Sequence, residues 1–234
     1  KKVKEMKNNK IYFNGKLAKL EDLPNNITLI ITGDNNTIKL NDFKGRGKLF
    51  IKMDCDNSVF DFGTDNTINK SVLVYYPTPE GKKLKNVSIE IGNNNIFNGD
   101  NIVFLSPIEE NNKISFGSFN LLAGNIYIRG RNDHIIFNKK NHEILNKEKN
   151  VIIGDKIWIC DNVQILPKTI IKDESVIALG SIVNKSFKFG NALIAGVPAL
   201  IKKKNISWHI SNDINKIDYE FPLKIQEEGE VNNG

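Results

Sequence analysis

The segment that decides the fold runs from Val151 to Val183 and reads VIIGDKIWICDNVQILPKTIIKDESVIALGSIV. Its repeat of six fits neither an α-helix, which turns every 3.6 residues, nor a strand that alternates every second residue. It fits a chain that turns a corner every six residues and points one aliphatic side chain inward each time. The repeating aliphatic residues are Ile153, Ile159, Ile165, Ile171, Ile177 and Val183.

A second position repeats with the same period, four places after each of the first five aliphatic residues. It holds an aliphatic or small residue every time, in the order Ile157, Val163, Thr169, Ser175 and Ser181. Three corners close one coil, and stacked coils bury a continuous column of Ile and Val. The sequence therefore predicts an all-β solenoid.

The same unit recurs upstream in a less regular form. Short alternating stretches are each followed by glycine and polar turn residues, with the glycines at 33, 63, 92, 117 and 154. Their uneven spacing predicts loops between coils. Asn is abundant, and it tolerates the left-handed backbone that tight corners require.

The chain is predicted to divide into three parts. Residues 1–24 form an N-terminal cap segment, and residues 25–204 form the solenoid. Loops leave the solenoid at 76–86, where Pro, Gly and Lys cluster, and at 132–150, which carries two histidines. Residues 205–234 form a C-terminal extension that is expected to be partly mobile, because its end is polar.

Composition narrows the class of protein. The chain has 234 residues, of which 40% are hydrophobic, and a formal net charge of +6. No apolar run approaches the ~20 residues of a membrane span, and no secretory signal is expected. Two distant cysteines fit a reducing cytoplasm. Lys is scattered and no basic helix occurs, so nucleic acid is not an expected partner, whereas an anionic ligand fits the charge.

His134 is the candidate general base. It stands where an alternating stretch meets a polar turn, and imidazole titrates near neutrality. Asp133 or Asn132 could orient its ring. The alternative is a surface imidazole in a loop. His134, His142, His209 and Cys160 match no zinc-ligand spacing, so no metal is expected.

Trp158 is the least expected residue of the regular run, because the hexad assigns it to neither repeating position. An outward Trp on a coil face should be covered by a neighbouring subunit or a ligand. Burial in an oligomer interface and one wall of a ligand cleft both remain open. The two coincide if the site lies between subunits.

Three segments together resemble the hexapeptide-repeat O-acetyltransferases: NVIIGDKIWICDNVQILPK at 150–168, SVIALGSIVNK at 175–185 and IAGVPALI at 194–201. The resemblance covers roughly residues 126–208. It implies a left-handed parallel β-helix, a homotrimer and acetyl-CoA as co-substrate. The N-terminal half looks like the Asn-rich coils of the branch that acts on capsular and other surface glycans, including those with sialic acid.

The resemblance also assigns site residues. Residues 132–136, Asn-Asp-His-Ile-Ile, occupy the place of the family's Asp-x-His-x-Ile segment, so His134 is implied to be the catalytic base and Trp158 the active-site Trp. Cys160 stands where Gly is usual, and Leu179 replaces a commoner Ala. The implied acetyl-CoA contacts are Asp161, Leu179, Gly180, Ser181, Asn184, Lys185 and Lys203.

The expected function is acetyl-CoA-dependent transfer to a hydroxyl of a bacterial surface glycan, with His134 as base and no acyl-enzyme. A backbone N–H near Gly180 is expected to stabilise the oxyanion. The alternatives are an acetyltransferase of small or nucleotide-linked amino sugars, a non-catalytic β-solenoid binding module, and a zinc hydro-lyase of the same fold.

Overall fold

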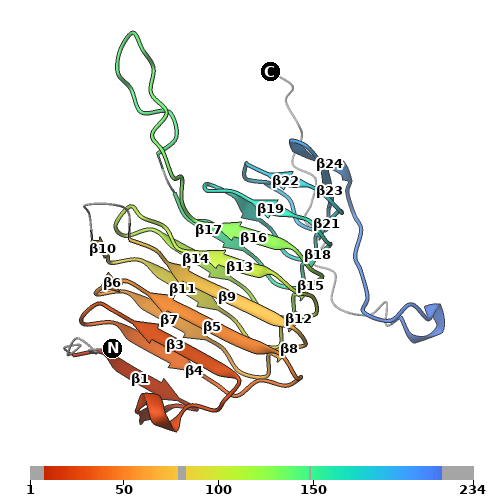
Figure 1. The fold of residues 1–234 in the computed structure, drawn as a ribbon. Coiled ribbons are helices and arrows are strands. Elements are labelled where there is room, and N and C mark those ends of the chain that lie inside the picture. Colours follow the sequence, from red (N-terminus) through yellow and green to blue (C-terminus); the bar gives the residue numbers. More distant parts are fainter. Residues whose placement is uncertain (1–7, 79–82, 148, 218–234) are drawn as a thin grey trace.

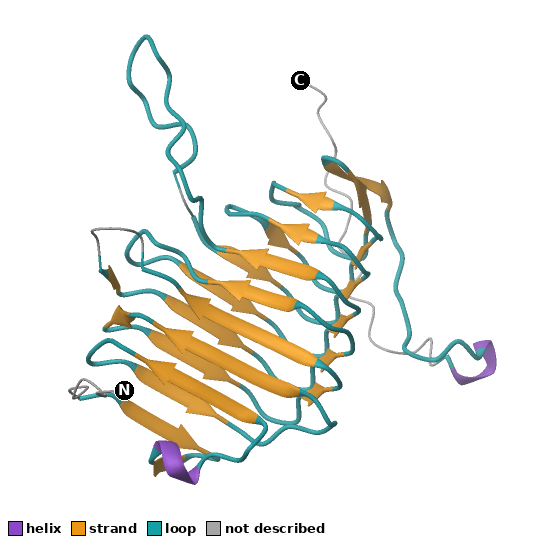
Figure 2. Cartoon of the chain, viewed as in Figure 1, coloured by secondary structure: helices purple, strands orange, loops and turns teal. Residues whose placement is uncertain are grey.

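The computed structural model describes residues 8–78, 83–147 and 149–217, and its regular structure is almost entirely strand (Figures 1 and 2). Three parallel sheets, here called A, B and C, form the sides of a prism. Each complete coil adds one strand to sheet B, then to A, then to C. The described part contains no helix long and apolar enough to cross a membrane.

Sheet A has eight strands, in the order β2 (Lys16–Ala18), β1 (Lys10–Phe13), β4 (Thr37–Leu40), β7 (Val59–Phe62), β11 (Ser88–Ile91), β14 (Lys113–Phe116), β17 (Val151–Ile153) and β20 (Ile170–Ile171). Sheet B has seven, in the order β22 (Ile182–Val183), β19 (Gln164–Ile165), β16 (Ile126–Arg129), β13 (Ile102–Leu105), β9 (Ser71–Tyr76), β5 (Lys48–Met53) and β3 (Ile27–Ile31).

Sheet C also has seven strands, in the order β24 (Ala199–Lys203), β23 (Leu193–Gly196), β21 (Val176–Ile177), β18 (Trp158–Ile159), β15 (Leu121–Leu122), β12 (Ile96–Phe97) and β8 (Thr67–Ile68). A small pair, β6 (Cys55–Asp56) and β10 (Leu84–Lys85), lies between sheets B and A. Two 3-10 turns complete the list, η1 (Leu20–Asp22) and η2 (Ile214–Lys216).

The hexads form regular coils of eighteen residues. Ile152 pairs with Ile170, Trp158 with Val176 and Gln164 with Ile182, so three hexads return the chain to the same place one coil higher. The six aliphatic residues of the repeat are at most 1% exposed, which confirms the inward column. They stand at the ends of the short strands, whereas the second repeating position, from Ile157 to Ser181, fills the corners and is also buried.

Upstream coils are longer and uneven, as the glycine spacing predicted. Hydrogen bonds between equivalent corner residues of successive coils span 29, 25 and 37 positions before the spacing settles at 18. The core changes with them, because aromatic rings replace part of the Ile column. Phe97, for example, lies 6.1 Å from Phe62 and 6.3 Å from Phe116 between ring centroids.

Asn residues serve the corners, as the composition suggested. In the described part of the chain, twelve of the eighteen non-glycine residues with positive φ are Asn. Other Asn side chains bridge coils from inside, since the buried Asn66 donates to Gly63 and Gly92 carbonyls and accepts from the Asn95 N–H at 2.8 Å. Hydrogen bonds between coils therefore satisfy most of the polar groups at these corners, although the buried Nδ2 of Asn120 has no hydrogen-bond partner among the described residues.

Four of the five predicted glycines stack at one corner, between sheets A and C. At Gly63, Gly92, Gly117 and Gly154, a Cβ atom would come within 2.5 Å of a side-chain oxygen from the coil above. That oxygen accepts a backbone N–H of the lower coil, as Asp155 Oδ1 does from Ser118 at 2.7 Å. Gly33 differs, because it follows a strand of sheet B and its Cβ would meet the Cys55 carbonyl.

The two ends of the solenoid are built differently. At the N-terminal end the hairpin of β1 and β2 extends sheet A, where Ile11 and Phe13 pack against the core and Leu17 and Leu20 remain exposed. At the other end, β24 folds back antiparallel on β23. Trp208 lies on the outer face of sheet C, beside Trp158. Residues 218–234 of the predicted extension lie outside the described residues.

Candidate functional site

The longest excursion from the coils is an arm whose described residues are 130–147 and 149–150, between β16 and β17, and it projects away from the prism (Figure 1). Its two sides pair across a bridge between Phe137 and Ile144, and the Leu145 N–H donates to the Ile136 carbonyl at 2.8 Å. Within one chain the arm touches little, so its apolar side chains are exposed: Ile135, Ile136, Phe137, Ile144 and Leu145.

His134 lies on the first side of this arm, near its base, and is exposed. Its carbonyl accepts from the Asn146 side-chain amide at 2.8 Å, and the Ile136 N–H donates to the same amide's oxygen at 2.7 Å. No described residue hydrogen-bonds the imidazole. The arm therefore fixes the backbone at His134 and leaves its ring available to a second molecule.

The expectation that Asp133 orients this ring is wrong for the single chain. The Asp133 carboxylate contacts the Arg129 guanidinium, and its other oxygen lies 3.0 Å from Arg131 Nε, although that N–H makes no hydrogen bond. The side-chain amide of Asn132 donates a hydrogen bond to the Asn146 carbonyl at 2.7 Å. Both candidates thus hold the base of the arm instead.

Trp158 stands on the outer face of sheet C and is 38% exposed. Part of its cover comes from the same chain. The ring of Trp208 lies 6.2 Å from that of Trp158, tilted by 45°, and its Nε1–H donates to the Lys156 carbonyl at 2.7 Å. Nothing in the sequence around Trp208 signals this contact between distant segments.

The two predicted catalytic residues do not meet within one chain. His134 belongs to the arm at the corner between sheets B and A, whereas Trp158 lies in β18 of sheet C, the third side of the prism (Figure 1). A site that uses both residues therefore requires two copies of the chain.

Four of the seven predicted cofactor contacts share the corner between sheets C and B. Asp161, Leu179, Gly180 and Ser181 occur there in two successive coils, where Leu179 is 68% exposed. A Cβ on Gly180 would meet nothing within 4 Å, so the surface is open at that point. An extended ligand that crosses two coils can lie against this corner.

Hydrogen bonds give two of these residues a structural role. Asp161 Oδ1 accepts from the Gly124 N–H at 2.9 Å, and the buried Ser181 hydroxyl donates to the Ala178 carbonyl at 2.6 Å. The Gly180 N–H donates to the Asp161 carbonyl at 3.0 Å. This N–H is therefore already engaged, and the oxyanion role of a backbone N–H near Gly180 stays a prediction.

The remaining three contacts are dispersed. Asn184 and Lys185 follow β22 at the corner between sheets B and A, and Lys203 ends β24 beside sheet C. All three are exposed. The Lys185 ammonium lies 5.8 Å from the centre of the Phe187 ring. One chain does not gather the seven residues in one place.

The remaining histidines stand apart. His142 lies at the tip of the arm with a φ of 58°, and His209 accepts the Ser211 N–H at Nδ1. Among the described residues, no group of three or more His, Cys, Asp or Glu could hold a metal ion.

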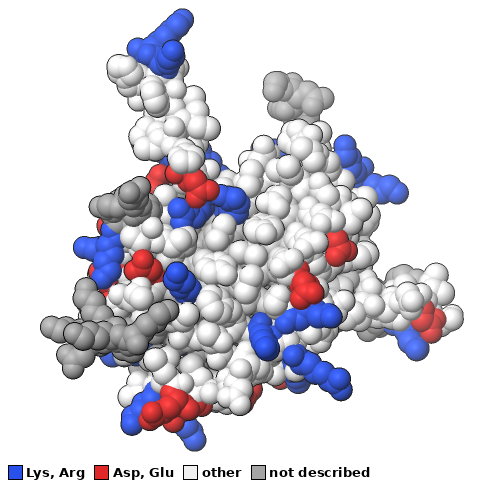
Figure 3. All heavy atoms as spheres, in the orientation of Figure 1, with Lys and Arg blue, Asp and Glu red and all other residues white. Residues whose placement is uncertain are grey.

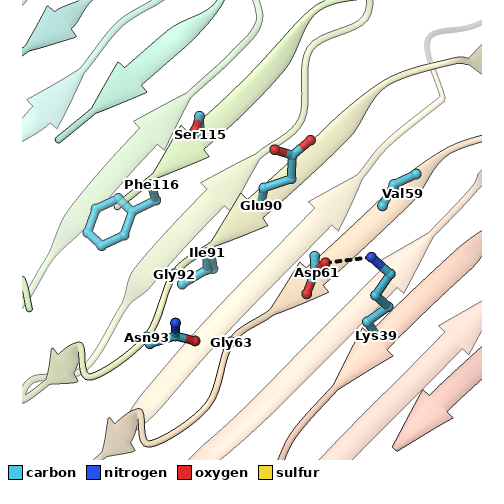
Figure 4. Close-up of a pocket in the computed structure, with 10 residues that line it drawn as sticks. All are labelled: Lys39, Val59, Asp61, Gly63, Glu90, Ile91, Gly92, Asn93, Ser115 and Phe116. Carbon is cyan, nitrogen blue, oxygen red and sulfur yellow. Dashed lines mark hydrogen bonds and ion pairs between the residues drawn. The ribbon is translucent and has the colours of Figure 1, made fainter. Parts of the chain in front are cut away.

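A shallow depression of about 490 Å³ lies on the outer face of sheet A, far from the predicted catalytic residues in sequence (Figure 4). Its strands present alternating charges that neutralise one another. Lys39 pairs with Asp61 at 3.0 Å, and Glu90 pairs with Lys113 at 3.2 Å. None of the predicted site residues lines it.

Comparison with known proteins finds local sequence similarity and a similar fold. No family model matches the chain. A protein of Escherichia coli (strain K12), assigned by its name to lipopolysaccharide biosynthesis as the O-acetyl transferase WbbJ, is 46% identical over 54 residues, 23% of this chain and 27% of that protein. The polysialic acid O-acetyltransferase of Neisseria meningitidis is 42% identical over 59 residues, 25% of this chain and 27% of that protein. The chain thus spans about a quarter of each relative.

The whole fold has a counterpart among solved structures. The polySia-specific acetyltransferase NeuO matches with a TM-score of 0.52 at 21% identity, over 89% of this chain and 88% of that one. The polysialic acid O-acetyltransferase OatWY matches with a TM-score of 0.48 at 24% identity, over 93% and 97%. The predicted resemblance is confirmed: this chain is a left-handed parallel β-helix of the hexapeptide-repeat type that also occurs in O-acetyltransferases.

Proposed function

We propose that this protein is an O-acetyltransferase that moves an acetyl group from acetyl-CoA to a hydroxyl of a bacterial surface glycan, in the cytoplasm. The observation that carries the proposal is the pair of local matches, above 40% identity, to two O-acetyltransferases whose names refer to surface glycans. The shared fold is consistent with it, because it supplies the coils on which Trp158 and the cofactor corner stand.

The proposed chemistry is direct transfer. His134 takes the proton of the acceptor hydroxyl, and the oxygen attacks the thioester carbonyl. The tetrahedral intermediate then collapses, the C–S bond breaks, and the proton on the imidazole passes to the departing thiolate. The ring of His134 is exposed and no described residue hydrogen-bonds it, which suits this role. Lys185 and Lys203 are exposed cations suited to the phosphates of the donor.

The proposal includes a homotrimer with its site between copies. Two features support assembly. The arm carries five exposed apolar residues, and the outer surface of sheet B over β9, β13 and β16 is mostly uncharged, with Arg129 at the end of β16 (Figure 3). The outward residues there include Leu73, Tyr75, Leu105 and Tyr127. Apolar surface of this kind is typical of permanent contacts.

The experiment that tests the base is His134→Ala, assayed for acetyl transfer with the oligomeric state measured in parallel. General-base catalysis contributes about 10²–10⁴-fold, so activity should fall by that factor while the assembly survives. His142→Ala is the matched control, since it removes another exposed histidine from the same arm. Undiminished turnover in His134→Ala would refute the assignment.

The nature of the acceptor is tested by comparing polymeric, oligomeric and monomeric sugars. A preference for free or nucleotide-linked amino sugars would favour the first alternative. Affinity for an acidic glycan should fall as salt rises, because surface charges are screened. If calorimetry detects no binding of CoA, the protein is a non-catalytic β-solenoid module and the proposed function fails.

A further inference from the structure

Phe119 is the unusual residue at the corner between sheets A and C. Its backbone is left-handed, with a φ of 59°, and so is that of the equivalent residue in other coils. Successive coils are linked at this corner, because the Phe119 N–H donates to Asn93 and the Lys156 N–H donates to Ser118. The equivalent left-handed residues are Asp65, Asn94, Lys156, Glu174 and Asn191.

A left-handed backbone is unfavourable for a residue with a bulky side chain, and Asn or Asp bears it best. Phe119 gains little packing in return, because it is 58% exposed. No described aromatic ring contacts it. Strain without a packing benefit in the single chain points to a role outside the chain.

Two more aromatic rings stand beside the same corner, one coil above. Trp158 follows Lys156 by two residues, and Trp208 donates its Nε1–H to the Lys156 carbonyl. Since Lys156 stacks directly on the coil of Phe119, these features are separated by one strand spacing, about 4.8 Å. Trp158 also pairs in register with Leu121, which follows Phe119 by two residues.

The C-terminal segment is tied down along this corner before it reaches Trp158. The Ile206 N–H donates to the Asn191 carbonyl, and the Ser207 hydroxyl donates to Glu174, both at 2.9 Å. Trp208 follows at Lys156. Residues 206–208 thus each hydrogen-bond a different one of three successive coils, and the last of them places its indole on the outer face of sheet C.

We propose that Phe119, Trp158 and Trp208 form an aromatic shelf that stacks against sugar rings of the acceptor glycan. The inference rests on the proposed function and names the acceptor subsite. Aromatic rings offer large flat apolar area to the C–H faces of sugars, and polar groups around them orient the ligand. Ser118 and the exposed Asn94 supply such groups at the same corner.

The chain provides its own reporter for this shelf, because its only two tryptophans are Trp158 and Trp208. Intrinsic fluorescence is titrated with polysialic acid and, for comparison, with a neutral glucan. Binding of the acidic glycan should change the emission and yield a Kd. Trp158→Phe and Trp208→Phe then show which indole reports it.

Phe119→Asn is the decisive variant. Relief of the strained backbone should raise Tm by about 2–4 °C, while loss of the ring should weaken glycan binding about two- to tenfold. The donor KM should not change. Asp65→Asn is the matched control, since it places the same residue at the same corner two coils away and should leave the Kd unchanged.

The outcomes separate the shelf from the activity. Acetyl transfer without any fluorescence response, or an unchanged Kd in Phe119→Asn, would overturn the shelf alone. Glycan binding through the shelf without acetyl transfer would overturn the proposed function alone. If Phe119→Asn instead dissociates the oligomer, the shelf is a contact between copies and the inference fails.

Discussion

The thiol of Cys160 shows what one side chain contributes at the predicted cofactor corner. Burial, and next the negative charge of Asp161, raise its pKa, although a hydrogen bond from the Leu179 N–H acts in the opposite direction. A raised pKa leaves less thiolate at neutral pH. The second cysteine, Cys55, is buried in the core, and burial raises its pKa to about 12. Both observations favour structural roles over nucleophilic ones.

We predict slow alkylation of Cys160. At pH 8 its reaction with iodoacetamide should be slower than that of the unfolded chain, and it should accelerate as pH rises above 9, because the thiolate fraction grows. Asp161→Asn keeps an acceptor for the Gly124 N–H but removes the charge, so the pKa falls and the rate should rise about two- to threefold. Mass spectrometry of the modified peptides gives the rates.

The control is Asp155→Asn, an equivalent change at a corner far from either cysteine, which should leave the rate unaffected. A Cys160 that reacts as fast as the unfolded chain at pH 8 would contradict the predicted protonation.

Residue roles were predictable where the sequence repeats and not where distant segments meet. The six-residue period alone predicts that Ile153 and its equivalents are buried. Trp208 carries no such signal, because its position depends on the path of residues 205–208 along three coils. Phe119 did carry such a signal, since it is an aromatic residue where the other coils place Asn, Asp, Lys or Glu. The corner had to be aligned before this exception could be recognised.

The corner between sheets A and C is the element that stacks the coils. Its glycines are required by close approach, since the space of a Cβ is occupied by the side-chain oxygen that accepts a backbone N–H. The sequence showed the motif of strand, glycine and polar turn. It did not show which corner each motif occupies, because loops of unequal length hide the coil count, and Gly33 was grouped with glycines of another corner.

We predict that Gly117→Ala destabilises the fold. Its Cβ would lie 2.3 Å from Asp155 Oδ1 and 2.5 Å from the Gly154 carbonyl, so the coil above must move. Overpacking of this kind costs about 1–3 kcal/mol, measured here by urea denaturation. Gly124→Ala, whose Cβ would have no neighbour closer than 3.3 Å, should cost less than about 1 kcal/mol. Equal stability of the two variants would refute the steric argument.

At the scale of the whole molecule, the prism holds His134 and Trp158 on different sides, although the proposed chemistry requires both in one site. A core that is continuous from coil to coil makes the three faces rigid with respect to one another, so His134 cannot reach Trp158 by bending the solenoid. The resemblance to the acetyltransferases identified His134 and Trp158 from the sequence. Their separation becomes visible only when each residue is assigned to a side of the prism. Closed rotational symmetry solves the problem, because every copy can lend its arm to the next.

Complementation tests this arrangement. In the proposed assembly, a crevice is the site between the arm of one copy and sheet C of the next. His134→Ala and Trp158→Ala should each be inactive alone, since every crevice then lacks one of the two side chains. When equal amounts are mixed, dissociated and reassembled, a crevice is intact if its arm comes from the Trp158→Ala copy and its sheet C from the His134→Ala copy. Random assembly makes about a quarter of the crevices intact, so about a quarter of the wild-type activity should return. If both groups acted within one copy, no mixture would recover activity, and the shared site would have to be abandoned.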